Sequence, residues 1–263
     1  MAAEAGKVDP MHQFTIEPLF GTDGWQIAGY NIPFTNSALW MVFAAVALLV
    51  FVAGGMKRQL VPGRWQMAVE GFTGFIDSML AANIGPAGKK YVPYIFSLFM
   101  FILFANILGM LPLALVPGLH PFTFTSHFSA TGVLAVLSFA IVLIVGFGKH
   151  KLHFFSLFIP HGTPLPMIPL IFVIELVSFL VRPFSLGLRL FVAMMAGHVL
   201  LEVLSGFVIN GINAGLGIGP VVSILSFILM IAIVALELLV AGIQAYVFAL
   251  LTSLYLNDAE NLH

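Results

Sequence analysis

The chain contains no cysteine and very few charged residues. The lack of cysteine excludes disulfides, iron–sulfur clusters, thiolate zinc sites and c-type haem attachment. Charged side chains make up 8% of the 263 residues and hydrophobic ones 60%, whereas soluble globular domains carry roughly 25% charged residues. So few charges could not cover the surface of a water-soluble fold, and the composition therefore predicts a polytopic membrane protein.

Several motifs that carry chemistry are also missing. There is no P-loop, so we expect neither nucleotide nor nucleic acid to bind this chain. No HExxH pattern or other suitably spaced pair of histidines occurs, so no metal, cofactor or intramembrane enzyme site is expected. No internal repeat is detectable, which disfavours a self-contained secondary transporter with alternating access.

Five apolar runs are long enough to form membrane-spanning helices, which need about 20 predominantly apolar residues. The sequence predicts an all-α membrane domain over residues 36–263, preceded by a polar external segment, residues 1–35, without the features of a cleaved signal. Residues 65–82 carry Glu70 and Asp77 on one helical face, which favours an amphipathic helix lying in the interface. The expected spans are 37–55, 91–115, 128–147, 169–207 and 220–256.

The last two apolar runs are unusually long. A helix of about 38 residues extends for about 57 Å, against a hydrocarbon thickness of about 30 Å. We therefore expect a long, inclined helical hairpin whose helices tilt steeply, break or bend, with Pro183 and Gly187 as weak points.

The basic residues predict the orientation of the chain. They gather in the segments between the first and second spans and between the third and fourth, whereas the loops 113–127 and 208–219 contain no Lys or Arg. By the positive-inside rule the basic segments face the cytoplasm. Five spans then place the N-terminus outside and the C-terminus inside. The basic residues concerned are Lys57, Arg58, Arg64, Lys89, Lys90, Lys149 and Lys151.

Arg189 lies near the middle of the fourth apolar run. Burying its guanidinium at bilayer depth costs about 2.5–3.5 kcal/mol, and arginine cannot avoid this cost by losing its proton. Glu175 lies about 21 Å along the helix axis towards the cytoplasm, and His198 about 14 Å towards the outer side. Glu202 follows His198 by one turn, on the same face.

On the last apolar run, Glu237 and Gln244 are seven residues apart and share a helical face. Protonatable groups are thus expected to be reachable from each side of the membrane, with the fixed charge of Arg189 between them. This arrangement fits a proton relay made of two separate halves, because the cation repels a proton that would otherwise leak across. Transfer then needs a mobile carboxylate, whose pKa a guanidinium within about 4–6 Å lowers by roughly 1–3 units.

From about residue 10 onwards the chain resembles the a subunit of the F-type rotary ATP synthase. The motif SLGLRLFVAMMAGH is the most specific, supported by IELVSFLVRP, ELLVAGIQAYVFALLTSLYL and NILGMLP. The resemblance implies a bacterial, proton-translocating stator subunit of the inner membrane. Its implied partners are the c-subunit ring, a peripheral stalk of b-type subunits and lipid. ATP chemistry would take place on other subunits, so the chain itself is not expected to be an enzyme.

The resemblance also implies roles for individual residues. Arg189 would face the essential carboxylate of the c subunit, and Glu175 and Ser178 would lie towards the cytoplasmic half-channel. The outer half-channel would contain His198, Glu202, Glu237, Gln244 and Asn106. Some bacterial members carry Glu and His in the reverse order at positions 198 and 237, and a frequent asparagine is Ala193 here.

Each of these roles has a structural alternative. Arg189 could form an ion pair with Glu175 or Glu237, and His198 could be a hydrogen-bonded interior histidine. Ser178 is equally consistent with helix packing, and Asn106 with an interhelical hydrogen bond. Arg182 is expected to snorkel or to pair with Glu175. The sequence does not exclude sodium as the coupling ion.

Overall fold

The structure is a computed structural model that describes most of the chain. It describes residues 14–16, 18, 25–27, 30–32, 34–56, 62–110, 123–151, 154, 158, 165–213 and 217–261. Most of the predicted external segment, residues 1–35, and the end of the predicted second span, residues 111–115, lie outside the described residues. Two short strands that the sequence analysis did not predict, β1 (Trp25–Ile27) and β2 (Tyr30–Ile32), pair antiparallel with Trp25 opposite Ile32.

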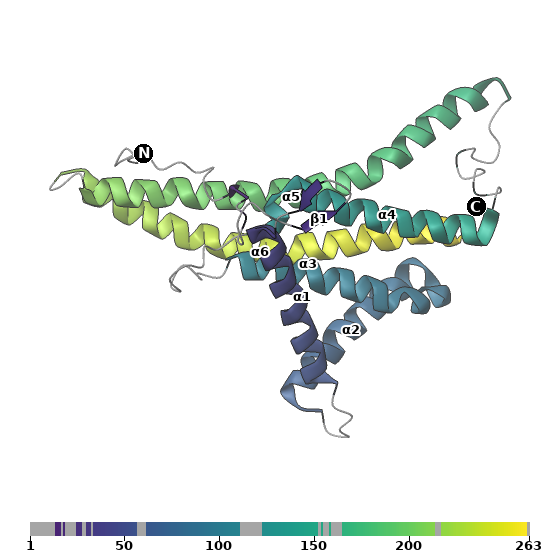
Figure 1. Ribbon diagram of the computed structural model, residues 1–263, viewed down its shortest axis with the longest axis horizontal. Coiled ribbons are helices and arrows are strands. Elements are labelled where there is room, and N and C mark those ends of the chain that lie inside the picture. The colour runs from purple at the N-terminus through teal and green to yellow at the C-terminus, as the bar shows by residue number, and fades with distance from the viewer. Residues whose placement is uncertain are drawn as a thin grey trace. The chain divides into compact units, whose positions relative to one another are not determined.

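The other described elements are helical (Figure 1). Five of the helical segments are long and apolar enough to cross a membrane, as judged by length and composition. This finding confirms the predicted all-α polytopic membrane fold. The five are α1 (Asn36–Gly55), the continuous segment of η2 (Gly85–Tyr91) and α3 (Val92–Met110), α4 (Phe128–His150), α5 (Ile168–Asn213) and α6 (Gly219–Glu260).

The last two helices are longer than their apolar runs. α5 has 46 residues and α6 has 42, because the helical backbone continues into polar residues at the ends of each run. α5 is one helix that contains Pro183, so an interruption of the helix does not occur. Gly187 is buried against α4, where an added Cβ would lie 3.1 Å from the carbonyl oxygen of Thr131. This glycine therefore allows two helices to approach closely.

α2 (Arg64–Asn83) forms where the amphipathic helix was expected. Its buried side chains include Val69, Ile76 and Leu80, which recur at the spacing of one helical face. α2 is not among the segments apolar enough to span a membrane. Its location in the membrane interface stays a prediction.

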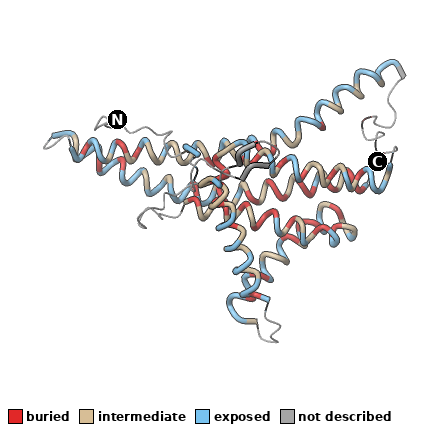
Figure 2. Tube along the Cα trace, viewed as in Figure 1, coloured by how far each residue is buried: buried red, intermediate tan, exposed pale blue. Residues whose placement is uncertain are grey.

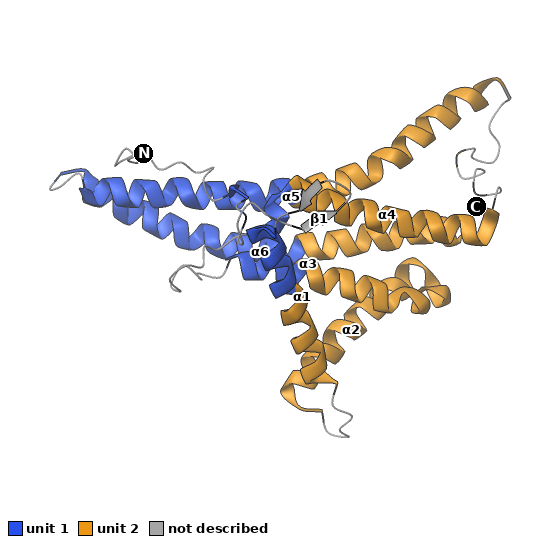
Figure 3. Cartoon of the chain, in the orientation of Figure 1, with its two compact units in different colours: residues 1–44, 103–127, 191–243 blue, residues 45–102, 128–190, 244–263 orange. Residues whose placement is uncertain are grey.

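The chain divides into two compact units (Figure 3). Unit 1 comprises residues 1–44, 103–127 and 191–243, and unit 2 comprises residues 45–102, 128–190 and 244–263. In unit 1 the C-terminal part of α5 and the N-terminal part of α6 lie side by side, and the Ser223 hydroxyl of α6 donates to the Val208 carbonyl oxygen of α5 at 3.0 Å.

Unit 2 has an aromatic and aliphatic core. The ring of Phe154, which is 1% exposed, lies 6.1 Å from that of Phe179 on α5, and the ring of Phe158 lies 5.4 Å from that of Phe179. Buried residues recur along α3, α4 and the C-terminal part of α6, whereas the first turns of α5 are largely exposed (Figure 2). α5 therefore leaves much of its apolar surface uncovered.

A polar feature of unit 2, which we call the Glu260 anchor, fixes the end of α6. Glu260 is 4% exposed and its carboxylate accepts hydrogen bonds from Lys90 at 2.9 Å, Lys149 at 2.7 Å and Tyr91 at 2.8 Å. These donors come from η2 and from the end of α4. The anchor thus joins the ends of three helical segments.

Candidate functional site

Unit 1 contains a buried polar cluster formed by His198 of α5, Glu237 of α6 and Thr123, which precedes η4 (Phe124–Ser126). His198 Nδ1 lies 3.6 Å from Glu237 Oε1, and His198 Nε2 lies 2.7 Å from the Thr123 hydroxyl. In the sequence, His198 and Glu237 lie on different apolar runs, and their spacing does not show that they meet. The fold brings their side chains together because α5 and α6 run side by side in this unit.

Glu237 is only 2% exposed, and within the described part of the chain neither of its carboxylate oxygens has a hydrogen-bond partner. Gly197 allows this placement, since an added Cβ there would lie 2.7 Å from Glu237 Oε1. A buried carboxylate without hydrogen-bond donors is costly unless it is neutralised by a proton or by a nearby cation. The carboxyl of Glu237 and the imidazole of His198 can satisfy this requirement by holding a proton on either group.

Asn106 of α3 is completely buried in unit 1, and both ends of its amide are engaged. Its Oδ1 accepts a hydrogen bond from the Thr125 hydroxyl at 2.9 Å, and its Nδ2 donates to the Ala241 carbonyl oxygen of α6 at 3.2 Å. These contacts fit the interhelical hydrogen bond that the sequence left as an alternative. A role for Asn106 in a proton path stays a prediction.

Two other predicted residues of the outer half-channel are placed differently. Glu202 belongs to unit 1, is partly exposed, and makes no hydrogen bond or ion pair within the described ranges. Gln244 belongs to unit 2 and is also partly exposed.

Arg189 belongs to unit 2 and its side chain is exposed. Among the residues that the structure describes, Arg189 takes part in no hydrogen bond or ion pair. A guanidinium on an apolar helix that has no partner among the described residues is available to bind an anionic group outside the chain. The structure therefore disfavours the intrachain ion pair considered in the sequence analysis.

Glu175 and Ser178 lie on the same stretch of α5 in unit 2, half-buried and exposed respectively. Arg182 does not pair with Glu175 as one sequence alternative held. Its guanidinium instead binds the Asp258 carboxylate of α6 at 2.8 Å and lies 5.2 Å from the ring of Tyr255. The alternative of a pair with Glu175 was wrong because Asp258, 76 positions away in sequence, is brought next to Arg182 by packing that spacing along α5 cannot show.

Thr123 and Asp258 were not predicted from the sequence to be site residues. Thr123 lies in a loop that drew notice only for lacking basic residues, and a single threonine carries no signal of its partner. Asp258 lies beyond the last apolar run and reads as a solvated helix end. The sequence around each residue carries no motif that predicts the contact of Thr123 with His198 or of Asp258 with Arg182.

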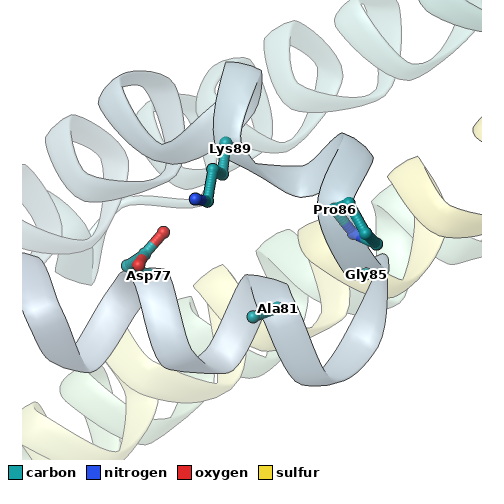
Figure 4. Close-up of a pocket in the computed structure, with 5 residues that line it drawn as sticks. All are labelled: Asp77, Ala81, Gly85, Pro86 and Lys89. Atoms are coloured by element: carbon teal, nitrogen blue, oxygen red, sulfur yellow. The ribbon is translucent and has the colours of Figure 1, made fainter.

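No cofactor or metal site stands out in the described parts of the chain. No group of three or more His, Asp or Glu side chains there could hold a metal ion. A cavity of about 340 Å³ in unit 2 is lined by Asp77, Ala81, Gly85, Pro86 and Lys89, with the Asp77 and Lys89 side chains pointing toward one another (Figure 4). None of the predicted site residues lines it.

Known proteins of one family are similar to this chain over nearly its full length. The sequence profile of the family described as ATP synthase A chain matches residues 37–257. A protein of Novosphingobium aromaticivorans named ATP synthase subunit a is 77% identical over 98% of this chain and 99% of its own length. Proteins of the same name from Erythrobacter litoralis and Rhodospirillum rubrum are 76% and 44% identical, over 100% and 97% of this chain and 100% and 99% of theirs.

Proposed function

Since this chain belongs to the ATP synthase A chain family, we propose that it is the stator subunit that conducts protons to and from the c-ring of a bacterial ATP synthase. It couples proton flow to rotation and ATP synthesis while catalysing no reaction itself. Its partners are the c-subunit ring, b-type stalk subunits and the lipid of the inner membrane. Residues 1–35 lie outside and the C-terminus is cytoplasmic.

The proton path consists of two offset half-channels. Protons enter from outside past His198, Glu202, Glu237 and Gln244 and load a c-ring carboxylate, which carries them round the ring. They leave on the cytoplasmic side past Glu175 and Ser178. Each proton that crosses contributes about 2.3 kcal/mol per 100 mV of membrane potential.

The observation that carries this proposal is the exposed guanidinium of Arg189, which pairs with none of the residues that the structure describes. A permanent cation stabilises the ionised form of a carboxylate that passes close to it, and so favours release of its proton. It also separates two groups of protonatable side chains, which prevents a direct leak. The buried Glu237–His198 pair supports the outer half-channel, because a carboxyl and an imidazole in one cluster can exchange a proton.

Replacement of Arg189 tests the proposal. We expect Arg189→Ala to abolish ATP-driven proton pumping in inverted membrane vesicles that contain the whole complex, because nothing then favours deprotonation of the c-ring carboxylate. Arg64→Ala, which removes an exposed arginine at the start of α2, serves as the control and should pump normally. Normal pumping by Arg189→Ala would refute the proposed role, and pumping by the isolated chain would favour a self-contained transporter.

A further inference from the structure

Thr123 lies at one edge of the His198 imidazole, and Glu237 lies towards the other. The two ring nitrogens face different groups, with Nε2 at 2.7 Å from the Thr123 hydroxyl and Nδ1 at 3.6 Å from Glu237 Oε1. The second distance is longer than a hydrogen bond of 2.7–3.2 Å. A small shift is therefore enough to bring Nδ1 within hydrogen-bond distance of Glu237. Rotation of the imidazole would instead turn Nδ1 away from the Glu237 carboxylate.

Thr123 is itself held firmly in unit 1. Its side chain is 5% exposed, and its carbonyl oxygen accepts hydrogen bonds from the backbone N–H of Ser126 at 3.0 Å and from the Ser126 hydroxyl. Gly109 of α3 makes room for the hydroxyl, since a Cβ at that position would overlap the Thr123 Oγ1. The hydroxyl is thus presented to His198 by a fixed backbone.

A hydroxyl group suits both protonation states of a histidine. It has one donor hydrogen and two acceptor lone pairs, and it can rotate about its C–O bond. It donates to Nε2 when the ring is neutral with its proton on Nδ1, and it accepts from Nε2–H when the ring is protonated. The contact therefore survives the gain and loss of a proton by the imidazole.

We propose that Thr123 is a positioning residue for His198, whose hydroxyl keeps the imidazole directed at Glu237 in both protonation states. This inference rests on the proposed function, because it assigns Thr123 a role in the same outer half-channel. Thr123 does not itself carry the transferred proton. It prevents the ring from turning away between one proton and the next.

The test compares variants that differ in the hydroxyl group. Thr123→Val keeps the shape and removes the hydroxyl, and Thr123→Ser keeps the hydroxyl. In inverted vesicles with equal amounts of assembled complex, we expect Thr123→Val to slow the initial rate of ATP-driven proton pumping about tenfold, which corresponds to about 1.4 kcal/mol. Thr123→Ser should stay within about twofold of the unaltered protein, a loss of about 0.4 kcal/mol at most.

Thr252→Val is the matched control. Thr252 is completely buried in α6, and its hydroxyl donates to the Phe248 carbonyl oxygen within the same helix. Its loss should leave pumping near normal. If Thr123→Val fails to assemble, Thr123→Ala replaces it in the comparison with Thr123→Ser. Equal slowing by the serine variant and by the variant without the hydroxyl would overturn the proposal, because packing would then explain the effect.

A double-mutant cycle with His198→Ala completes the experiment. We expect Thr123→Val to add no further slowing once the imidazole is gone, and a full further loss would overturn the positioning role. Slow pumping by His198→Ala with normal pumping by Thr123→Val would sink this inference alone. Normal pumping by His198→Ala would instead remove His198 from the proposed proton path, and the role of Thr123 with it.

Discussion

Glu237 and Glu260 are both buried glutamates on α6, yet their surroundings differ completely. Glu260 is bound by two lysines and a tyrosine, whereas the carboxylate of Glu237 has no hydrogen-bond donor in the described residues and faces an imidazole at 3.6 Å. A fully compensated charge stabilises structure. A buried carboxylate without donors is costly unless a proton or a nearby cation neutralises it, and a group that can take up a proton suits a relay.

Replacing Glu237 with glutamine should distinguish a structural role of this residue from a role as a proton relay. Glu237→Gln keeps the side-chain volume but cannot take up or release a proton, so we expect normal assembly and proton pumping slowed about tenfold or more. Pumping in inverted vesicles and the amount of assembled complex are the two measurements. Glu70→Gln changes an exposed glutamate on α2 and should alter neither. If Glu237→Gln pumped at the normal rate, Glu237 would be a buried structural residue.

At the scale of elements, the C-terminal part of α6 is held by several side-chain contacts within unit 2. The Asn83 amide donates to the Ser253 hydroxyl at 2.8 Å, Arg182 binds Asp258, and Glu260 binds Lys90, Lys149 and Tyr91. These contacts connect α6 with α2, α5, η2 and α4. The C-terminal end of α6 is therefore fixed within unit 2.

The Glu260 anchor should contribute more to stability than the Arg182–Asp258 pair. Glu260→Gln removes a buried charge with three donors, and we expect it to cost about 1–3 kcal/mol. Asp258→Asn breaks a pair whose side chains are 28% and 40% exposed, and it should cost less than about 1 kcal/mol. Thermal unfolding midpoints of the purified complex compare the two. A larger drop for Asp258→Asn would contradict this order.

At the scale of the whole molecule, the proposal requires two aqueous paths that open on opposite sides of the membrane. The proposal assigns Ser178 to the cytoplasmic path and Glu202 to the outer one, and these residues fall in different compact units. The chain has no native cysteine, so a single introduced thiol gives an unambiguous label.

We expect Ser178→Cys to react with a membrane-impermeant maleimide from the cytoplasmic side, in inverted vesicles. Glu202→Cys should react only from the outer side, in right-side-out vesicles, because the proposed paths are separate. Blocking with a permeant maleimide first is the control for specificity in both preparations. Reaction of both cysteines from one side would contradict the arrangement of two half-channels.

Much of the fold could be predicted because the bilayer imposes one requirement on every span. A helix must satisfy all backbone hydrogen bonds within about 20 apolar residues, so a run such as 37–55 identifies α1 almost to the residue. The ends of α5 and α6 were placed less well, because helical hydrogen bonding continues after the apolar pattern stops. The strands β1 and β2 lie in a polar segment where no such requirement acts.

The sequence by itself determined that this is a five-span helical membrane protein with a central, permanently charged arginine, because hydropathy and the chemistry of the guanidinium are local properties. Only the tertiary structure decided which polar groups meet. His198 lies next to Glu237 and Thr123, and both ends of the Asn106 amide form hydrogen bonds. Arg182 binds Asp258, whereas Arg189 is exposed. Such contacts depend on how separate helices pack, and packing depends on shape across the whole helix surface rather than on the spacing of any one motif.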